Sequence, residues 1–329
     1  KNVGSFGVYA TRYGNFSIYN ADLLIILGSQ LNPSLIGSSA NFFAPNAKKI
    51  LVDIDKAQLN EENKVKIDLK INCDVKDFID ELNKREIKWE LNNSWFEKIK
   101  NLKKKYPIIQ EDYFKQKKNV NPYVFFDTLS DHTSENDIII PDASANLVWT
   151  YQAYKVSKNQ KIFTALNHSP MGYSVAAAIG ASLGSPESNV IAIIGDGSMQ
   201  MNIQELENIK SLKLPIKIFL INNKGYGMVK QTIDTWLDSK YVGCDETSGL
   251  SLPNFQNVTK AYGINCTEIN NHNDMKEKIE ITLKSPGPIL CDVKLDPNEK
   301  IIPKTKAGSP LHKMLPALEE KEIQSNIIE

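Results

Sequence analysis

The chain has 329 residues, enough for about two domains of ordinary size. Its 39 basic residues balance 39 acidic ones and 41% of its residues are hydrophobic, which favours a soluble globular protein over one that binds nucleic acid or an anionic membrane. The four cysteines form no C-x-x-C pair, no apolar stretch is long enough to cross a bilayer, and the first residues show no signal-peptide pattern, so we expect a cytoplasmic protein.

Short runs rich in β-branched residues mark the first part of the chain. Residues 21–28 and 48–55 predict buried parallel strands, and a third strand is predicted at 67–71. The apolar spacing of residues 74–82 predicts a helix. We therefore expect residues 1–83 to form a strand-and-helix unit with three strands at most. The lysine-rich residues 84–120 predict a surface helix and linker whose charges face solvent.

From residue 121 onward, helix and strand signals alternate. Helices are predicted at 123–129, 147–154, 171–183 and 199–212, and strands at 138–141, 190–194, 216–221, 265–269 and 288–294. This alternation predicts the α/β class with a doubly wound parallel sheet. We assign the sheet to a domain over residues 121–311, followed by a C-terminal tail at 312–329.

The sharpest local signal is a hydrophobic strand that ends in Gly195-Asp196-Gly197-Ser198 and leads into a helix. Ligands of open α/β sheets bind beyond the carboxyl ends of the strands, and the first turn of a helix offers free N–H groups to an anion. Gly197 would let the backbone approach a ligand closely, and Asp196 places a carboxylate where a cation could neutralise a phosphate. A Gly-Asp-Gly tripeptide by itself is more often an ordinary turn.

The next strand ends in Asn222-Asn223-Lys224-Gly225. A right-handed crossover would make it a parallel neighbour of the first strand, so Asp196 and Asn223 would face one site. A carboxylate, an amide oxygen and a backbone carbonyl are oxygen ligands of the kind that Mg²⁺ prefers. The combination resembles the Gly-Asp-Gly and Asn-Asn motif of thiamine-diphosphate-dependent enzymes.

Other segments resemble one branch of these enzymes, the acetolactate synthases. They are residues 168–181 with Met171-Gly172-Tyr173, residues 223–229, and the strands at 21–28 and 52–55. The resemblance covers nearly the whole chain and implies a thiamine-diphosphate-binding fold preceded by a partial Rossmann-like central domain. It further implies thiamine diphosphate and Mg²⁺ as cofactors, with carboligation of a decarboxylated 2-keto acid as the reaction.

The resemblance also implies roles for single residues. Asp196, Asn223 and the carbonyl of Gly225 would bind Mg²⁺, and Gly197 and Ser198 would donate to the diphosphate. The other implied contacts are Asn146 to the diphosphate, the backbones of Ser169 and Met171 to the aminopyrimidine ring, the Met201 side chain to the bent cofactor, and His168, Tyr226 and Met228 to the substrate. Without the motif, both methionines would be read as ordinary core residues, and His168 as a hydrogen-bonded structural histidine.

Some features depart from the family pattern. No segment resembles the Glu-x-x-Ala helix that carries the catalytic glutamate, so we expect this residue on a pyrimidine domain outside the sequence and an isolated chain that is inactive. The incomplete central domain and the start at Lys1 favour a truncated chain over a natural split subunit. Thr232 stands where the family usually has a tryptophan, with Trp236 nearby. Gly28-Ser29-Gln30 lacks the flavin-contacting arginine, so FAD stays open.

Three functions remain open at this point. The first is an acetolactate synthase-like carboligase acting on a 2-keto acid. The second is a simple 2-keto acid decarboxylase. The third is a non-catalytic, cofactor-binding subunit that needs a pyrimidine-domain partner. The resemblance implies a homodimer or homotetramer formed by pairing of pyrimidine and diphosphate domains.

Overall fold

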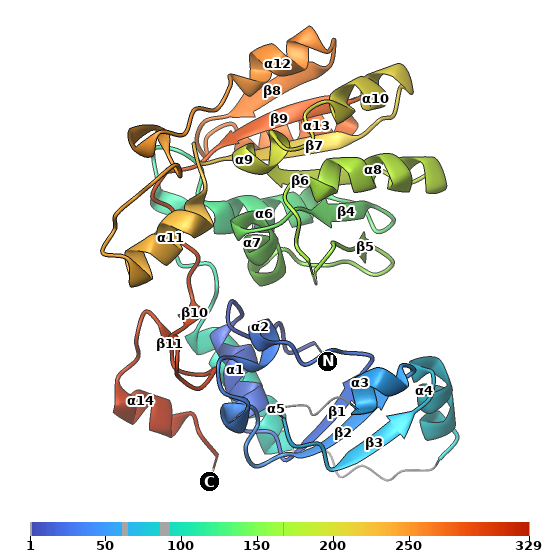
Figure 1. Cartoon of the computed structure of the whole chain (residues 1–329), viewed down its shortest axis with the longest axis vertical. Helices are drawn as coiled ribbons and strands as arrows, with labels where there is room; N and C mark the ends of the chain where they lie inside the picture. The colour runs from blue at the N-terminus through green and yellow to red at the C-terminus, as the bar shows by residue number, and fades with distance from the viewer. Residues whose placement is uncertain (1, 61–64, 86–92, 167, 329) are drawn as a thin grey trace. The chain divides into compact units, whose positions relative to one another are not determined.

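The computed structural model describes residues 2–60, 65–85, 93–166 and 168–328, and these fall into two compact units (Figure 1). One unit combines Lys1–Ile108 with Ile302–Glu329, and the other is Ile109–Ile301. The division differs from the expected boundaries, because residues 93–108 and 302–311 belong to the first unit rather than to a linker and to the second domain. Within the described ranges, no helix has both the length and the apolar character that a membrane span requires.

The first unit contains a three-stranded parallel sheet in the order β1-β2-β3. Its strands are β1 (Leu23–Leu27), β2 (Lys48–Asp53) and β3 (Leu69–Asn72), so the three expected strands are present, the last one slightly displaced along the chain. The expected burial of the first strand was wrong, because every second side chain of β1 is exposed. Helices α3 (Lys56–Asn60) and α4 (Val75–Asn83) pack on this sheet. The predicted helix α4 begins where the Asp74 carboxylate accepts a hydrogen bond from the Lys76 N–H.

The rest of the first unit is mainly helical, with one short strand pair, and comes from both ends of the chain. Phe16, Leu102, Tyr106 and Ile323 form one of its cores. Helix α5, which lies in the lysine-rich segment and carries Leu102, therefore buries an apolar side while its charged side faces solvent. The elements are α1 (Arg12–Tyr19), α2 (Pro33–Ile36), η1 (Ala40–Phe42), α5 (Asn93–Lys105), α14 (Glu320–Ser325) and the short antiparallel pair β10 (Lys304–Thr305) and β11 (Met314–Leu315).

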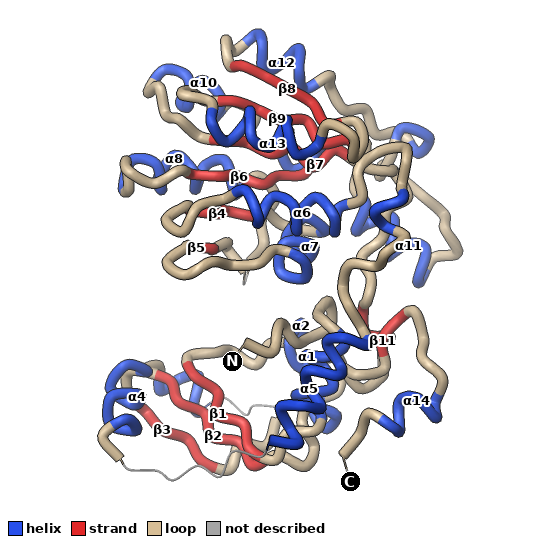
Figure 2. Tube along the Cα trace, turned by 180° about the vertical axis from the view of Figure 1, so that it is seen from behind, coloured by secondary structure: helices blue, strands red, loops and turns tan. Residues whose placement is uncertain are grey.

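The second unit is built on a six-stranded, all-parallel sheet in the order β5-β4-β6-β7-β9-β8 (Figure 2). The strands are β4 (Ile138–Pro141), β5 (Lys161–Ile162), β6 (Val190–Gly195), β7 (Lys217–Asn222), β8 (Asn265–Ile269) and β9 (Ile289–Lys294). This sheet confirms the predicted α/β class and doubly wound topology.

Helices cover both faces of this sheet. On one face, side chains of α8 (Tyr173–Gly184), α10 (Glu205–Ser211) and α12 (Phe255–Ala261) belong to one hydrophobic core that also contains Ile218 and Leu220 of β7. On the other, α6 (Pro122–His132) meets Phe219 through Phe125, whose ring centroid lies 5.6 Å away, and α7 (Ala145–Ala153) and α13 (Met275–Lys284) pack beside α6. Alternate residues of one strand thus point to opposite helical layers, as the period of two requires.

Some predicted elements of the second unit were wrong. The helix expected at 199–212 is two short helices, α9 (Asp196–Met199) and α10, separated by a turn in which Asn202 donates its side-chain N–H to Gly172. The helix expected at 171–183 begins at Tyr173, because Gly172 takes a left-handed φ of 89°. Elements that the sequence reading did not predict are β5, α12, α13, α11 (Gly227–Trp236), η2 (Tyr113–Lys115) and η3 (Glu246–Ser248).

Candidate functional site

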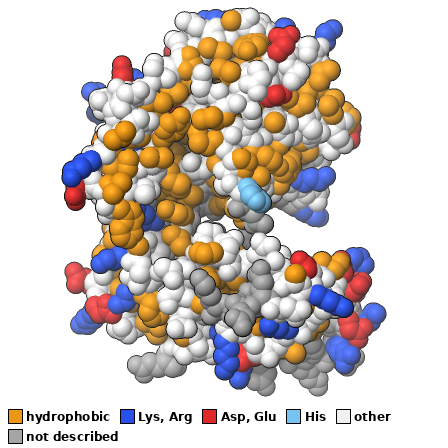
Figure 3. Space-filling view, in the orientation of Figure 1, with side chains coloured by type: hydrophobic (Ala, Val, Ile, Leu, Met, Phe, Trp, Pro, Cys, Tyr) orange, Lys and Arg blue, Asp and Glu red, His pale blue; other side chains and the backbone are white. Residues whose placement is uncertain are grey.

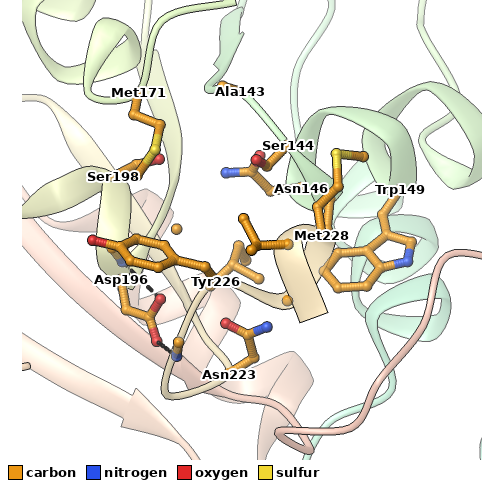
Figure 4. A pocket seen from close by; sticks show the side chains of 17 residues that line it. Ala143, Ser144, Asn146, Trp149, Met171, Asp196, Ser198, Asn223, Tyr226 and Met228 are labelled. Carbon is orange, nitrogen blue, oxygen red and sulfur yellow. Dashed lines mark hydrogen bonds between the residues drawn. The ribbon is translucent and has the colours of Figure 1, made fainter. Parts of the chain in front are cut away.

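The site lies where the sheet of the second unit changes direction. The chain passes from β4 to the edge strand β5 and then returns to β6 on the other side of β4. In doubly wound sheets, ligands bind in the crevice beyond the carboxyl ends of the strands at such a switch point. Loops that follow β4, β6 and β7 line one pocket there (Figure 4), and its lining residues are Ala143, Ser144, Ala145, Asn146, Trp149, Met171, Gly195, Asp196, Gly197, Ser198, Ile221, Asn223, Gly225, Tyr226, Gly227, Met228 and Val229.

The loop after β4 forms one wall of the pocket. Ser144 holds a left-handed φ of 71° directly before α7, an uncommon conformation for a residue with a side chain. Asn146 is buried, and its side-chain oxygen Oδ1 accepts a hydrogen bond from the Leu147 N–H at 2.7 Å. Its amide nitrogen lies 3.5 Å from the Ile193 carbonyl oxygen, a long contact that leaves the amide hydrogens available to a ligand.

Asp196 is the buried charge of the site. Its side chain is 1% exposed, and its two oxygens accept hydrogen bonds from the backbone N–H groups of Gly197 at 2.7 Å and Gly225 at 3.1 Å (Figure 4). None of the ion pairs found among the described residues involves this carboxylate. Burial raises the pKa of Asp196 to about 7 despite these hydrogen bonds, because nothing cationic offsets the lost hydration.

The loop after β7 brings a second oxygen donor to the same place. Lys224 takes a left-handed φ of 58°, and Gly225 forms a bridge with Asp245. A side chain at Gly225 would place its Cβ 2.4 Å from the Cys244 carbonyl oxygen, so only glycine fits between the two segments. The Asn223 side chain is 8% exposed and lies beside Asp196 in the pocket (Figure 4).

The structure adds a steric reason for the glycine at position 197. A Cβ on Gly197 would lie 2.2 Å from Cε1 of Tyr226, whose ring covers this part of the turn. The sequence suggested that Gly197 lets a ligand approach the backbone. The glycine also makes room for an aromatic ring of the neighbouring loop, so the loops after β6 and β7 are packed against each other through Tyr226.

Most of the predicted site residues come together in this pocket, and three do not line it. His168 is exposed, and Ser169 is half-buried with a φ of 44°. Met201 is 49% exposed, but its Cβ lies 3.2 Å from the place where a Cβ on Gly172 would be, so it borders the turn that carries Met171. Thr232 and Trp236 of α11 are exposed and also lie outside the pocket lining.

Sequence reasoning missed several lining residues. Ala143, Ser144 and Trp149 follow β4, and their place at the switch point would have identified them had the strand order been known. Val229 lines the pocket from α11, a helix that was not predicted. The motif residues could be identified from their residue types and spacing, whereas these residues line the pocket only because of the strand order of the sheet.

The donor set suits a hard cation that a ligand helps to hold. The described part of the chain contains no cluster of three or more His, Cys, Asp or Glu side chains able to bind a metal unaided. The pocket offers one carboxylate from Asp196, an amide from Asn223 and the carbonyl of Gly225, which also accepts a hydrogen bond from the Gly227 N–H at 3.2 Å. Mg²⁺ commonly combines few protein oxygens with phosphate oxygens and water, so these residues fit a magnesium diphosphate.

Comparison with known families identifies the class of protein. Residues 142–293 match the model of the thiamine pyrophosphate enzyme C-terminal TPP binding domain, and residues 1–82 match the model of the central domain of these enzymes. The chain belongs to the thiamine pyrophosphate enzymes. The first match contains the whole switch-point pocket, so the observed loops after β4, β6 and β7 are part of the TPP-binding domain.

Individual relatives narrow the resemblance. The chain is 33% identical to the acetolactate synthase large subunit of Porphyra purpurea over 311 residues, which cover 93% of this chain and 51% of the relative. It is 29% identical to the acetolactate synthase isozyme 1 large subunit of Escherichia coli over 308 residues, covering 94% of this chain and 53% of the relative. The large subunit of Lactococcus lactis is 30% identical over 308 residues. The chain thus spans about half the length of these relatives.

Proposed function

We propose that this chain holds thiamine diphosphate and Mg²⁺ for an acetolactate synthase-like carboligation of a decarboxylated 2-keto acid. One observation carries the proposal: Asp196 is a buried carboxylate without a cationic partner, and it shares its pocket with Asn223 and Gly225. A magnesium ion would supply the missing positive charge. The similarity to three acetolactate synthase large subunits supports the choice of reaction.

Different residues would bind the two ends of the cofactor. Asp196, Asn223 and the Gly225 carbonyl would hold the metal, while Ser198, Gly197 and Asn146 would bind the diphosphate. On the other side of the pocket, the backbones of Ser169 and Met171 would hold the aminopyrimidine ring, and Met201 would support the bent cofactor from the turn that borders Gly172. When bound, thiamine diphosphate supplies the electron sink for decarboxylation of a 2-keto acid.

Binding of the metal and the cofactor gives the direct test. Asp196→Ala or Asn223→Ala should abolish Mg²⁺-dependent binding of thiamine diphosphate and leave the fold intact. The loss should exceed the roughly 10- to 100-fold that removal of an outer-shell partner costs at a metal site. Titration calorimetry measures the affinity, and far-ultraviolet circular dichroism checks the fold. Unchanged affinity in either variant would remove the metal assignment.

We further propose that binding and catalysis are separable in this chain. Asp196 is the one carboxylate among the described residues that line the pocket, and it is committed to the metal. The glutamate that would promote proton transfer at the aminopyrimidine would therefore come from elsewhere. Proton exchange at C2 of thiamine diphosphate, followed by nuclear magnetic resonance, should stay close to the rate of the free cofactor. An enhancement of orders of magnitude would show that these 329 residues fill the role themselves.

The acceptor specificity of the whole enzyme is a separate proposal. His168, Tyr226 and Met228 are the candidates for substrate contact, and the last two line the pocket. Because Thr232 and Trp236 are exposed on α11, we expect no strong preference for 2-ketobutyrate over pyruvate as acceptor. A competition assay on the intact enzyme decides this point. Formation of acetolactate from pyruvate would exclude a plain decarboxylase.

We also propose that the second unit pairs with a pyrimidine domain in a homodimer or homotetramer. Figure 3 shows hydrophobic side chains gathered on the face of this unit that carries α8 and α11. Val229 and Trp236 of α11 and Leu183 of α8 are exposed. Such apolar surface favours association. Sedimentation velocity of the purified chain should show self-association that mild detergent reverses, and a strictly monomeric chain would contradict this.

A further inference from the structure

A buried carboxylate from β4 holds the turn that leads into α8. Asp142 directly follows β4 and is completely buried. Its two oxygens accept hydrogen bonds from the N–H groups of Gly172 at 3.1 Å and Ser174 at 2.8 Å. The residue that precedes α8, Gly172, has no side chain to cap the helix. The N–H of Ser174 in the first turn and the N–H of Gly172 just before it are thus satisfied by a residue about one helix-and-strand unit earlier in the chain.

The same turn is held from a second side. The Asn202 side chain donates a hydrogen bond to the Gly172 carbonyl at 3.0 Å. A Cβ on Gly172 would lie 2.9 Å from this amide nitrogen, and the φ of 89° is one that glycine adopts readily. Asp142 and Asn202 together hold both the N–H and the C=O of Gly172. The turn therefore has little freedom to move relative to β4 and α9.

The residues next to both partners of this hydrogen-bonded link line the pocket. Met171 precedes Gly172 and lines the pocket, and Ala143 follows Asp142 and lines it as well. Asp142 thus joins the wall that carries Met171 to the wall formed by the loop after β4. A shift of the turn would change the distance between Met171 and the metal-binding loops after β6 and β7.

We propose that Asp142 is a positioning residue that sets the Met171–Gly172 turn at the spacing required to bind both ends of thiamine diphosphate at once. The proposal rests on the proposed function, since it assumes that the ring end of the cofactor lies against Met171. Precise placement of binding groups depends on such supporting hydrogen bonds, which hold the contacting residues in their productive geometry. A residue that merely caps α8 would affect stability and leave the choice between ligands unchanged.

The test compares two probes that share only the diphosphate end. Titration calorimetry on the full chain with Mg²⁺ measures the affinity for thiamine diphosphate and for inorganic diphosphate. Asp142→Asn keeps the size and one acceptor oxygen but loses the second acceptor. We expect its affinity for thiamine diphosphate to fall by about 10-fold, the scale of a lost outer-shell hydrogen bond, while its affinity for inorganic diphosphate stays at the wild-type value.

Asp137, a buried aspartate at the other end of β4, provides a matched control. Asp137 precedes β4, is 3% exposed, and accepts hydrogen bonds from the Ser134 N–H at 2.7 Å and the Asn189 side chain at 3.1 Å. Asp137→Asn should lower the thermal midpoint and leave the ratio of the two affinities unchanged. If Asp142→Asn does not fold, Asn202→Ala removes the other support of the turn and should lower the same ratio by a smaller factor.

The outcomes separate this inference from the function on which it rests. Equal changes for both probes, or an unchanged ratio in Asp142→Asn and Asn202→Ala, would reduce Asp142 to a helix cap and overturn the inference alone. A wild-type chain that binds neither probe, or binding that survives Asp196→Ala, would overturn the proposed function and the inference with it. A selective loss of thiamine diphosphate binding supports both.

Discussion

The carboxyl ends of β6 and β9 each present a buried carboxylate, and the two are treated in opposite ways. Asp196 after β6 and Asp292 within β9 are both 1% exposed. Asp292 forms an ion pair with Lys294 and accepts a hydrogen bond from the Asn222 side chain at 3.0 Å. Asp196 has backbone N–H donors only, and burial raises its pKa to about 7.

The difference shows which buried charge belongs to the scaffold. A buried charge is costly unless it is paired or binds a metal. At β9 the pairing is built into the strand, because Lys294 lies two residues after Asp292 and so faces the same side of the sheet. At β6 the residue two positions after Asp196 is Ser198, and under the proposed function a bound Mg²⁺ would supply the compensating charge. We therefore read Asp292 as structural and Asp196 as functional.

Exchanging each carboxylate for its amide tests this contrast most strongly. Asp196→Asn should lose Mg²⁺-dependent thiamine diphosphate binding and leave the stability of the metal-free chain at pH 8 unchanged or higher, because it removes an unpaired buried charge. Asp292→Asn should keep the binding and lose about 2–3 kcal/mol of stability, because Lys294 loses its anionic partner and the amide keeps only one of the two acceptor oxygens that Lys294 and Asn222 use. Calorimetric titration and urea unfolding of both variants provide the two readouts.

Each variant is the control for the other. Because both substitutions preserve side-chain size at equally buried positions, a general packing defect would affect them alike. A loss of binding in both, or a loss of stability in both, would show that the two carboxylates do not differ in role.

The next effect concerns the packing between the loops after β6 and β7. Gly197→Ala would bring a methyl group against the Tyr226 ring, where the Cβ position lies 2.2 Å from Cε1. Overpacking of this kind costs about 1–3 kcal/mol, and it should displace Tyr226 and weaken binding of the cofactor. A second change, Tyr226→Leu, should relieve the clash, so the double variant should be more stable than Gly197→Ala alone. Strictly additive losses of stability would contradict this contact.

The motif residues and the topology were predictable from the sequence to different degrees. Asp196 and Asn223 could be placed at neighbouring strand ends because hydrophobic runs mark β6 and β7 and parallel neighbours share one edge. Asp142 could not be connected to Gly172, since that link depends on where β4 enters the sheet. The sequence predicts helix through the turn at residues 200–204, because the hydrogen bond from the Asn202 side chain to Gly172 is a tertiary contact that the local sequence does not reveal.

A third prediction uses the pH dependence of the unpaired carboxylate. The pKa of Asp196 is raised from its ordinary value of 3.8 to about 7. At pH values between these two, the carboxyl is therefore protonated in the folded, metal-free chain and ionised in the unfolded chain. The contribution of this group to the free energy of unfolding is therefore present at low pH and lost as the pH rises through 7. Binding of Mg²⁺ must displace the proton, so the affinity should rise by up to about tenfold per pH unit below 7 and then level off.

The comparison variant for this slope is Asp196→Asn, which has no proton to lose at this position. Urea unfolding at several pH values should show the wild-type chain losing stability relative to Asp196→Asn between about pH 4 and pH 7 in the absence of metal, and a constant difference above pH 7, because the pKa rises from 3.8 to about 7 on folding. Parallel pH profiles for the two proteins would mean that Asp196 keeps an ordinary pKa and is already ionised at low pH.

The smallest expected effect comes from making the β9 carboxylate resemble the β6 carboxylate. Lys294→Met removes the cation that pairs with Asp292 and leaves the Asn222 side chain as a donor. Breaking a fully buried pair costs about 3 kcal/mol or more, and the loss here should be smaller because the Lys294 side chain is 28% exposed and partly hydrated. Thiamine diphosphate affinity at pH 8 should stay at the wild-type value, since Lys294 does not line the pocket.

The negative charge of Asp292 already contributes to the raised pKa of Asp196, so removal of Lys294 should move the pH midpoint of Mg²⁺ binding slightly upward. Urea unfolding and the pH profile of Mg²⁺ affinity measure the two effects. A large loss of cofactor affinity at pH 8 would place Lys294 in the binding site and end the distinction between a structural and a functional carboxylate.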